Sequence, residues 1–250
     1  MNNPFIKQNK QISIFITAGY PSLESTTEQI LLLQNKGIDF IEVGIPFSDP
    51  MADGPVIQQT SSIALANGMQ MDLLFEQLDS IKDQVKIPLV MMGYLNPVLQ
   101  YGLDKFLMKC KEQNIASVIL PDMSLEIYER FHKKQFEQIG ISVSFLITPL
   151  TQDDRIKKIA EASKNSFVYL VSKTSITGEK NDIDSKLVAR YQEIKVLCAE
   201  TPVMLGFGIS TLKDIEKAHV HCDGAIIGSA FLKAVEKDSL VAFLDEIVFG

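Results

Sequence analysis

Short apolar runs alternate with amphipathic segments from one end of this 250-residue chain to the other. The apolar runs are rich in β-branched residues and nearly continuous, which is typical of parallel strands covered on both faces. We therefore predict eight strands, over Ile12–Ala18, Asp39–Gly44, Pro88–Gly93, Ala116–Leu120, Ser142–Ile147, Phe167–Ser172, Val203–Gly206 and Gly224–Ile227.

The segments between these runs repeat apolar residues at helical spacing. The first lies between Pro21 and Gly37, a start and stop pair that is common at helix ends. We predict helices over Ser22–Asn35, Gln58–Asn67, Met71–Gln84, Leu103–Gln113, Ser124–Gln138, Gln152–Ser163, Asp184–Ala199, Thr211–Ala218 and Val235–Val248.

Eight strand–helix units with short connections favour one closed (β/α)8 barrel, a TIM barrel of the α/β class. No linker, charge block or low-complexity run interrupts the series, so we expect a single domain over residues 1–250. The length fits, because a barrel of this kind uses about 250 residues. An open doubly wound sheet is the alternative topology.

Composition narrows the class of protein. A net charge of −7 argues against a nucleic-acid or anionic-membrane surface, since both need clustered lysine and arginine. The cysteines Cys110, Cys198 and Cys222 form no C-x-x-C pair, which indicates a reducing compartment. The apolar run at Ile12–Ala18 is too short to span a bilayer and lacks the layout of a secretory signal. We expect a soluble cytoplasmic protein.

Two carboxylates are the strongest candidates for chemistry. Glu42 lies inside an apolar strand, where a charge costs several kcal/mol unless it is paired or protonated. Asp53 lies in the loop after that strand, and the ends of barrel strands hold the acid–base groups of barrel enzymes. The alternatives are a structural ion pair for Glu42 and an ordinary Asp-Gly turn for Asp53. Asp122, after the fourth strand, either lines the pocket or caps a helix.

Three late loops are rich in small residues, at Ser175–Gly178, Gly206–Ser210 and Gly228–Ser229. Glycine lets backbone amides approach an anion, and the loops after strands seven and eight are the recurrent phosphate site of barrels. The arginines Arg130, Arg155 and Arg190 all fall in predicted helices. We therefore predict a phosphate-binding barrel whose cradle is made mainly of backbone amides and hydroxyls.

The histidines are more typical of surface positions near helix ends than of a catalytic site, with a metal contact by the His219/His221 pair as the alternative. His132, His219 and His221 fall on or beside helices, away from the predicted active face. No nucleophile triad and no H-x-x-x-H spacing stands out. The residues point to acid–base catalysis without a metal or cofactor.

Over nearly its whole length the chain resembles the α subunit of tryptophan synthase. The glutamate strand with its aspartate loop is specific to that family, whereas the glycine loops alone would match many phosphate-binding barrels. The segments that carry the resemblance are Phe15-Ile-Thr-Ala-Gly-Tyr-Pro21, Ile41-Glu-Val-Gly-Ile-Pro-Phe-Ser-Asp-Pro50, Ala52-Asp-Gly-Pro55, Met92-Gly-Tyr-Leu-Asn96, Pro121-Asp122, Tyr169-Leu-Val-Ser172, Thr177-Gly178, Gly206-Phe-Gly-Ile-Ser210 and Gly228-Ser-Ala230.

The resemblance implies a lyase that cleaves indole-3-glycerol phosphate to indole and glyceraldehyde 3-phosphate. In that reaction Glu42 would shuttle protons between indole C3 and the adjacent hydroxyl, and Asp53 would stabilise the positive charge on the ring. The residues that match the indole slot fit ordinary barrel core equally well: Phe15, Tyr94, Ile119, Tyr169 and Phe207. Those that match the phosphate cradle are Gly178, Gly208, Gly228 and Ser229, and Thr177 matches a threonine that meets the Asp53 loop.

The resemblance also implies a partner, a β subunit that carries pyridoxal phosphate and receives indole in an α2β2 heterotetramer. The loops around Pro50–Asp53 and Asn96–Gly102 would make the contact, and this chain itself would bind no cofactor. The chain departs from the family at Lys173, usually arginine, at Ser175, often glycine, and at Ser124, often proline. Its N-terminus has room for at most part of the extra helix at the barrel bottom.

Two other functions remain open on the residues alone. One is a barrel that isomerises or decarboxylates a sugar phosphate, although no catalytic lysine or metal-binding histidine is placed at a strand end. The other is a regulatory subunit that binds indole-3-glycerol phosphate weakly and activates a β partner. Turnover with and without a β subunit separates these alternatives from the lyase.

Overall fold

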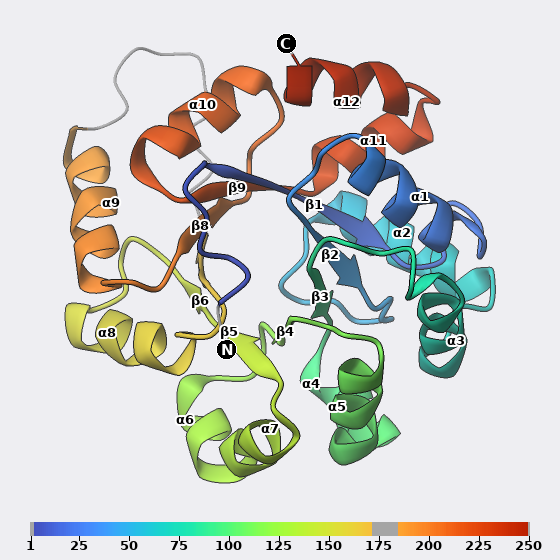
Figure 1. The fold of residues 1–250 in the computed structure, drawn as a ribbon, viewed down its shortest axis with the longest axis horizontal. Coiled ribbons are helices and arrows are strands. Elements are labelled where there is room, and N and C mark those ends of the chain that lie inside the picture. The colour runs from blue at the N-terminus through green and yellow to red at the C-terminus, as the bar shows by residue number, and fades with distance from the viewer. Residues whose placement is uncertain (1–2, 172–184, 250) are drawn as a thin grey trace.

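The computed structural model describes residues 3–171 and 185–249 (Figure 1). Within them, parallel strand segments form one sheet in the order β5-β4-β3-β2-β1-β9-β8-β7-β6. The segments are β1 Gln11–Thr17, β2 Phe40–Gly44, β3 Leu89–Met92, β4 Ser117–Ile119, β5 Ser142–Ser144, β6 Leu146–Ile147, β7 Val168–Val171, β8 Val203–Gly206 and β9 Gly224–Ile227.

The sheet closes on itself. Only Phe145 separates β5 from β6, so the two segments are halves of one barrel strand. β5 pairs with β4 and β6 pairs with β7, while β1 pairs with β2 on one side and with β9 on the other. The predicted (β/α)8 barrel is therefore confirmed, and the open doubly wound sheet is wrong.

Helices surround the strands (Figure 1). They bury their apolar faces against a sheet whose own strands are buried along nearly their whole length, as the continuous apolar runs predict. The helices are α1 Ser25–Asn35, α2 Pro55–Ala66, α3 Met71–Ile81, α4 Leu95–Tyr101, α5 Leu103–Glu112, α6 Leu125–Ile127, α7 Lys133–Ile139, α8 Asp153–Ala162, α9 Ser185–Leu197, α10 Leu212–His221, α11 Ser229–Glu236 and α12 Leu240–Phe249, with a π-helical turn at Tyr128–His132 between α6 and α7.

The helix predictions differ from the structure in four places. α4 and the start of α11 fall where we expected loops, and the predicted helix Val235–Val248 is broken after Glu236. Asp238 makes that break, because its φ of 53° is left-handed and cannot continue a helix. The predicted helix Ser124–Gln138 is interrupted by the π-helical turn.

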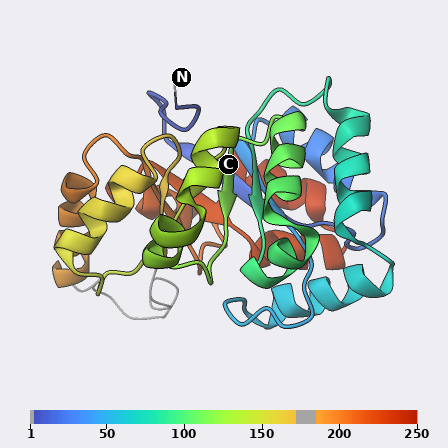
Figure 2. The same cartoon turned by 90° about the horizontal axis from the view of Figure 1, so that it is seen from below.

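The N-terminal segment closes one end of the barrel. Residues 3–10 contain no helix, and Phe5 packs edge-on against Phe40 and Phe167, with ring centroids 5.1 and 5.0 Å away. Figure 2 shows this segment at the end of the barrel opposite α2, the helix that follows Asp53. Phe5, Phe40 and Phe167 thus form a buried aromatic cluster at the barrel bottom.

Across residues 3–171 and 185–249, the helices are all too short or too polar to cross a membrane.

Candidate active site

A cavity of about 340 Å³ opens at the carboxyl ends of the strands. Its walls come from strands and loops far apart in the sequence, namely Phe15, Glu42, Asp53, Gly54, Ile57, Met92, Tyr169, Phe207, Gly208, Ile209, Ser210, Ile226, Gly228, Ser229, Ala230 and Lys233. A larger hollow of about 930 Å³ lies near the amino ends of β4 and β5, but lysines and glutamates of the surface line much of it. The smaller cavity is the candidate site because it holds a buried carboxyl group.

Glu42 sits in the middle of β2, with Phe15 of β1 as its neighbour in register. The side chain is fully buried, and neither carboxyl oxygen has a hydrogen-bond partner among the described residues. Burial raises the pKa of Glu42 from 4.5 to about 8, since a desolvated carboxylate is unfavourable. No ion pair with another described residue accounts for Glu42, and its raised pKa favours the protonated acid at neutral pH in the wall of the cavity.

Asp53 is held by a tyrosine from the next strand unit. Tyr94 donates its hydroxyl hydrogen to Oδ2 of Asp53 at 2.9 Å and accepts one from the Ala52 amide at the same distance. Burial raises the pKa of Asp53, and the hydrogen bond from Tyr94 opposes that shift. Tyr94 thus holds the Asp53 carboxylate at the wall of the cavity. The carboxylate is not taken up by hydrogen bonds within its own turn.

Two aromatic side chains form an apolar wall beside Glu42. Tyr169 on β7 is buried, and its ring lies edge-on to Phe207 with centroids 6.2 Å apart. Close packing fixes this wall, because a Cβ atom on Gly206 would lie 2.1 Å from the Tyr169 hydroxyl oxygen. On the other side, a Cβ atom on Gly44 would lie 2.4 Å from the Phe15 ring. The two glycines therefore allow the rings to reach their positions.

Two helix N-termini follow the late loops, and they differ in one respect. Side chains cap α10, where Thr211 and Asp214 form a reciprocal capping box. α11 begins after Gly228 and has no side-chain cap. Its first amides are therefore available to an anion, which the helix dipole also favours.

Gly228 has room for a side chain in the empty cavity. A Cβ atom there would meet nothing closer than 3.6 Å, and the residue's φ of −115° is open to any amino acid. Packing alone therefore does not require this glycine. Close approach of a ligand to the start of α11 would require it.

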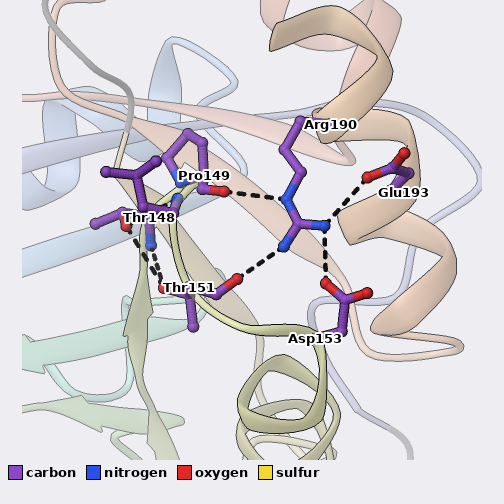
Figure 3. Close-up of polar contacts among 7 residues, drawn as sticks. Thr148, Pro149, Thr151, Asp153, Arg190 and Glu193 are labelled. Atoms are coloured by element: carbon purple, nitrogen blue, oxygen red, sulfur yellow. Dashed lines mark hydrogen bonds and ion pairs between the residues drawn. The ribbon is translucent and has the colours of Figure 1, made fainter. Parts of the chain in front are cut away.

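Arginines take no part in this site. Arg190 on α9 donates to the carbonyl oxygens of Pro149 and Thr151 at 3.0 and 2.7 Å and pairs with Asp153 and Glu193 (Figure 3). Arg155 pairs with Glu126, and Arg130 lies over the ring of Phe131. Among the described residues, those that a phosphate at the loops after β8 and β9 would meet are therefore backbone amides, hydroxyls and Lys233.

The structure brings most of the predicted site residues into one cavity. Tyr94 lies behind Asp53 and does not line that cavity, and Ile119 is buried in β4 away from it. Thr177 and Gly178 lie outside the described residues, as do Lys173 and Ser175. The predicted residues that line the cavity are Glu42, Asp53, Phe15, Tyr169, Phe207, Gly208, Gly228 and Ser229.

Lys233 is the main residue that sequence reasoning missed. It lies four residues after Ser229 on α11, so both side chains share one face of that helix. The spacing Gly-Ser-x-x-x-Lys was a usable signal, but we had expected no helix at Ser229. Ile57, Met92, Ile209 and Ile226 were also missed, because nothing in their type separates them from core residues.

Asp122 takes one of its two predicted roles, that of a helix cap, but it caps a different helix from the one that follows it in the sequence. Its carboxylate accepts hydrogen bonds from the Leu95 amide at 2.9 and 3.1 Å, so it caps α4 of the preceding unit. Ser124 is the cap of α6, with its hydroxyl accepting from the Ile127 amide. Among the described residues, no group of three or more His, Cys, Asp or Glu side chains is placed to hold a metal ion.

Comparison with known proteins agrees with this geometry. The sequence profile of the family "Tryptophan synthase alpha chain" matches residues 3–245. The tryptophan synthase alpha chain of Flavobacterium psychrophilum is 43% identical over 250 residues, covering 99% of this chain and 98% of that protein. The chain of Christiangramia forsetii is 44% identical over 238 residues, covering 95% and 93%.

Solved structures show the same fold. Tryptophan synthase subunit alpha from Campylobacter jejuni superposes with a TM-score of 0.84 at 32% identity, covering 98% of this chain and 96% of that one. A mutant tryptophan synthase alpha subunit from Pyrococcus furiosus gives 0.84 at 28% identity, covering 97% and 99%.

Proposed function

The chain belongs to the tryptophan synthase alpha chain family, lyases of tryptophan biosynthesis, and we propose that it cleaves indole-3-glycerol phosphate to indole and glyceraldehyde 3-phosphate. One observation carries the chemical part of the proposal. Glu42 is a fully buried carboxyl group that faces the cavity without a hydrogen-bond partner among the described residues. A proton-transfer role accounts for such a group, whereas a purely structural role leaves its cost unexplained.

Glu42 both gives and takes a proton in the proposed reaction. The protonated carboxyl group donates its proton to C3 of the indole ring, which leaves positive charge on the ring. The resulting carboxylate then accepts the proton of the adjacent glycerol hydroxyl while the C–C bond breaks and the hydroxyl carbon becomes an aldehyde. The transferred proton stays on indole C3, and Glu42 ends protonated as it began. The cycle is balanced, so we propose that this chain needs no metal or cofactor.

Asp53 is proposed to stabilise the charged ring. Its carboxylate is held by Tyr94 before substrate arrives, so little reorganisation is needed when positive charge develops at the indole N–H. Phe15, Tyr169 and Phe207 supply the apolar walls for the ring. Ile119 is omitted from this role because it does not reach the cavity.

The phosphate is proposed to bind at the start of α11. The uncapped amides after Gly228, the Ser229 hydroxyl and the Gly208 backbone surround that end of the cavity, and Lys233 supplies a positive charge one turn along the helix. This is the arrangement of backbone donors expected when no guanidinium group is available.

We further propose a β subunit as partner, in an α2β2 assembly in the cytoplasm, with pyridoxal phosphate bound only by that partner. Large apolar side chains are exposed in the two segments implicated in the contact. Met51 is 90% exposed in the loop after β2, and Leu99 is 46% exposed in α4. A covering protein would remove both from water, at a gain of about 25 cal/mol per Å² of apolar surface.

The test is indole release from indole-3-glycerol phosphate by the wild type and by Glu42→Gln, each alone and with a β subunit. We expect wild-type turnover that rises with the β subunit and falls at least about 1,000-fold in the variant, because an amide cannot carry the proton. Glycerol 3-phosphate binding should be unchanged in the variant, which is the control for its fold. Cleavage by Glu42→Gln near the wild-type rate would refute the assigned role, and no cleavage by any wild-type sample would favour a regulatory subunit.

A further inference from the structure

The loop after β8 contains two consecutive residues with left-handed backbone. Phe207 has a φ of 69° and Gly208 a φ of 76°. Glycine adopts this conformation freely, but for a bulky residue such as phenylalanine it costs on the order of 1 kcal/mol or more. Both residues line the candidate active site. Something outside the two residues must therefore hold this turn in place.

Asp214 is the residue that anchors the other end of the same loop. Its Oδ2 atom accepts four hydrogen bonds, from the amide and hydroxyl of Ser210 at 3.2 and 3.1 Å and from the amide and hydroxyl of Thr211 at 3.1 and 2.9 Å. The Asp214 side chain lies on the first turn of α10, and the residue is only 8% exposed. A rigid helix thus fixes the backbone two residues after the strained turn.

The bonds to Asp214 also decide which amides remain for a ligand. The amides of Ser210 and Thr211 are already bonded to Asp214, so these two amides are not open to an anion. Gly208 and the uncapped start of α11 face the same cavity. The arrangement therefore favours a phosphate between Gly208 and α11 over one at Ser210 and Thr211.

We propose that Asp214 is a positioning residue for phosphate binding: it holds the Phe207–Gly208 turn in the conformation that completes the cradle opposite α11. This inference rests on the proposed function, since it names a further residue of the same site. The affinity for phosphate should change in the direction opposite to that expected from charge alone. Removing a carboxylate near a phosphate should tighten binding on electrostatic grounds alone, whereas loss of positioning should weaken it.

The experiment measures the dissociation constant of glycerol 3-phosphate and the kcat and KM for indole-3-glycerol phosphate in Asp214→Ala and Asp214→Asn. We expect the dissociation constant to rise about tenfold in Asp214→Ala and about threefold in Asp214→Asn, whose amide oxygen still accepts hydrogen bonds but without charge. KM should rise in parallel with the dissociation constant while kcat stays within about twofold, because Glu42 lies on β2 and Asp53 in the loop after β2, not in the loop after β8. Asp214→Asn carries the test if Asp214→Ala fails to fold.

Two further variants separate positioning from general stability. Ser124→Ala removes the cap of α6 and should leave glycerol 3-phosphate binding unchanged. Adding Phe207→Asn to Asp214→Ala should recover at least half of the lost affinity on a logarithmic scale, since asparagine tolerates left-handed backbone.

Three outcomes would overturn the inference while leaving the proposed function standing: unchanged or tighter glycerol 3-phosphate binding in Asp214→Ala, an equal loss in Ser124→Ala, or no recovery in the double variant. A wild type that binds no glycerol 3-phosphate and cleaves no indole-3-glycerol phosphate would overturn both together.

Discussion

At the scale of single residues, the free-energy cost of burying the Glu42 carboxyl group is the clearest indication of function in the molecule. A glutamine of nearly the same shape would avoid burying an ionisable group, and the empty cavity gives the carboxyl group no partner among the described residues. The chain therefore keeps an acid where packing alone would favour a neutral side chain.

This cost predicts a pH-dependent gain in stability for Glu42→Gln. The folded-state pKa of Glu42 is raised to about 8 from 4.5, so between these values the folded protein binds more protons than the unfolded chain. The wild type should lose stability as pH rises from about 4.5 to 8, by at most about 1.4 kcal/mol per pH unit from this group, and level off above 8. Urea unfolding of both proteins at pH 5, 7 and 9 should show the variant's advantage growing over that window.

The control variant is Glu126→Gln, whose stability should change with pH in the opposite direction. The exposed Arg155 pair lowers the pKa of Glu126, so its small contribution is present above the unfolded value and lost in acid. Glu126→Gln should therefore be slightly less stable than the wild type at neutral pH. An advantage of Glu42→Gln that is the same at pH 5 and pH 9 would contradict the assigned pKa.

The chemistry of a site residue decides whether it can be recognised from the sequence alone. Glu42 stands out because a carboxylate inside an apolar strand is anomalous wherever the strand lies. Lys233 and Asp214 are ordinary surface types on helices, and only the geometry of their loops gives them a place at the site. Tyr94 was assigned to the indole slot, but its hydroxyl is used to hold Asp53.

At the scale of elements, Arg190 ties α9 to the loop after β6 (Figure 3). Its guanidinium group reaches two backbone carbonyls and two carboxylates at once, which no other side chain can do. The loop from Thr148 to Thr151 also has hydrogen bonds of its own, because the Thr148 amide donates to the Thr151 hydroxyl at 3.0 Å. The contacts of Arg190 add the connection between this loop and α9.

Arg190→Lys should lower the free energy of unfolding by about 1–3 kcal/mol, because one ammonium group cannot satisfy both carbonyls. Arg155→Lys is the matched control: its pair with Glu126 is exposed, and exposed pairs contribute about 0–1 kcal/mol. Denaturant unfolding of both variants at one pH provides the comparison. Equal losses would mean that the contacts to Pro149 and Thr151 contribute nothing.

The strands were easier to predict than the helices, for a physical reason. Parallel strands buried on both faces read as continuous apolar runs, and β8 and β9 occur at the predicted bounds. α4 and α11 were missed because each begins directly after a strand, within segments read as active-face loops. The break at Asp238 carries no glycine or proline signal, so its left-handed backbone could not be foreseen.

At the scale of the whole molecule, one aromatic side chain joins the two halves of the barrel at its closed end. Phe5 is fully buried between Phe40 of β2 and Phe167 near the start of β7. The sequence could predict a closed barrel from eight alternations, but nothing in it marked Phe5 as the side chain that packs there. That outcome depends on the space left between strands, which composition does not encode.

Phe5→Ala should lower the free energy of unfolding by about 3–5 kcal/mol, the usual range for removing a buried phenylalanine, while KM stays the same because the active face is at the other end. Phe131→Ala is the matched control, since Phe131 is 61% exposed, and it should change stability by less than about 0.5 kcal/mol. Chemical unfolding followed by steady-state kinetics tests both parts. A similar loss in the two variants would show that Phe5 does not anchor the barrel.

The pairing of β1 with β9 has a consequence for how the chain is made. During synthesis the outer edge of β1 has no strand to bond with until residues 224–227 have left the ribosome, after every other described strand. For most of that time the nascent chain carries an open, apolar sheet edge, the kind of surface that pairs with other chains. We therefore expect dependence on chaperones to be greatest for ribosome-bound chains that stop short of β9.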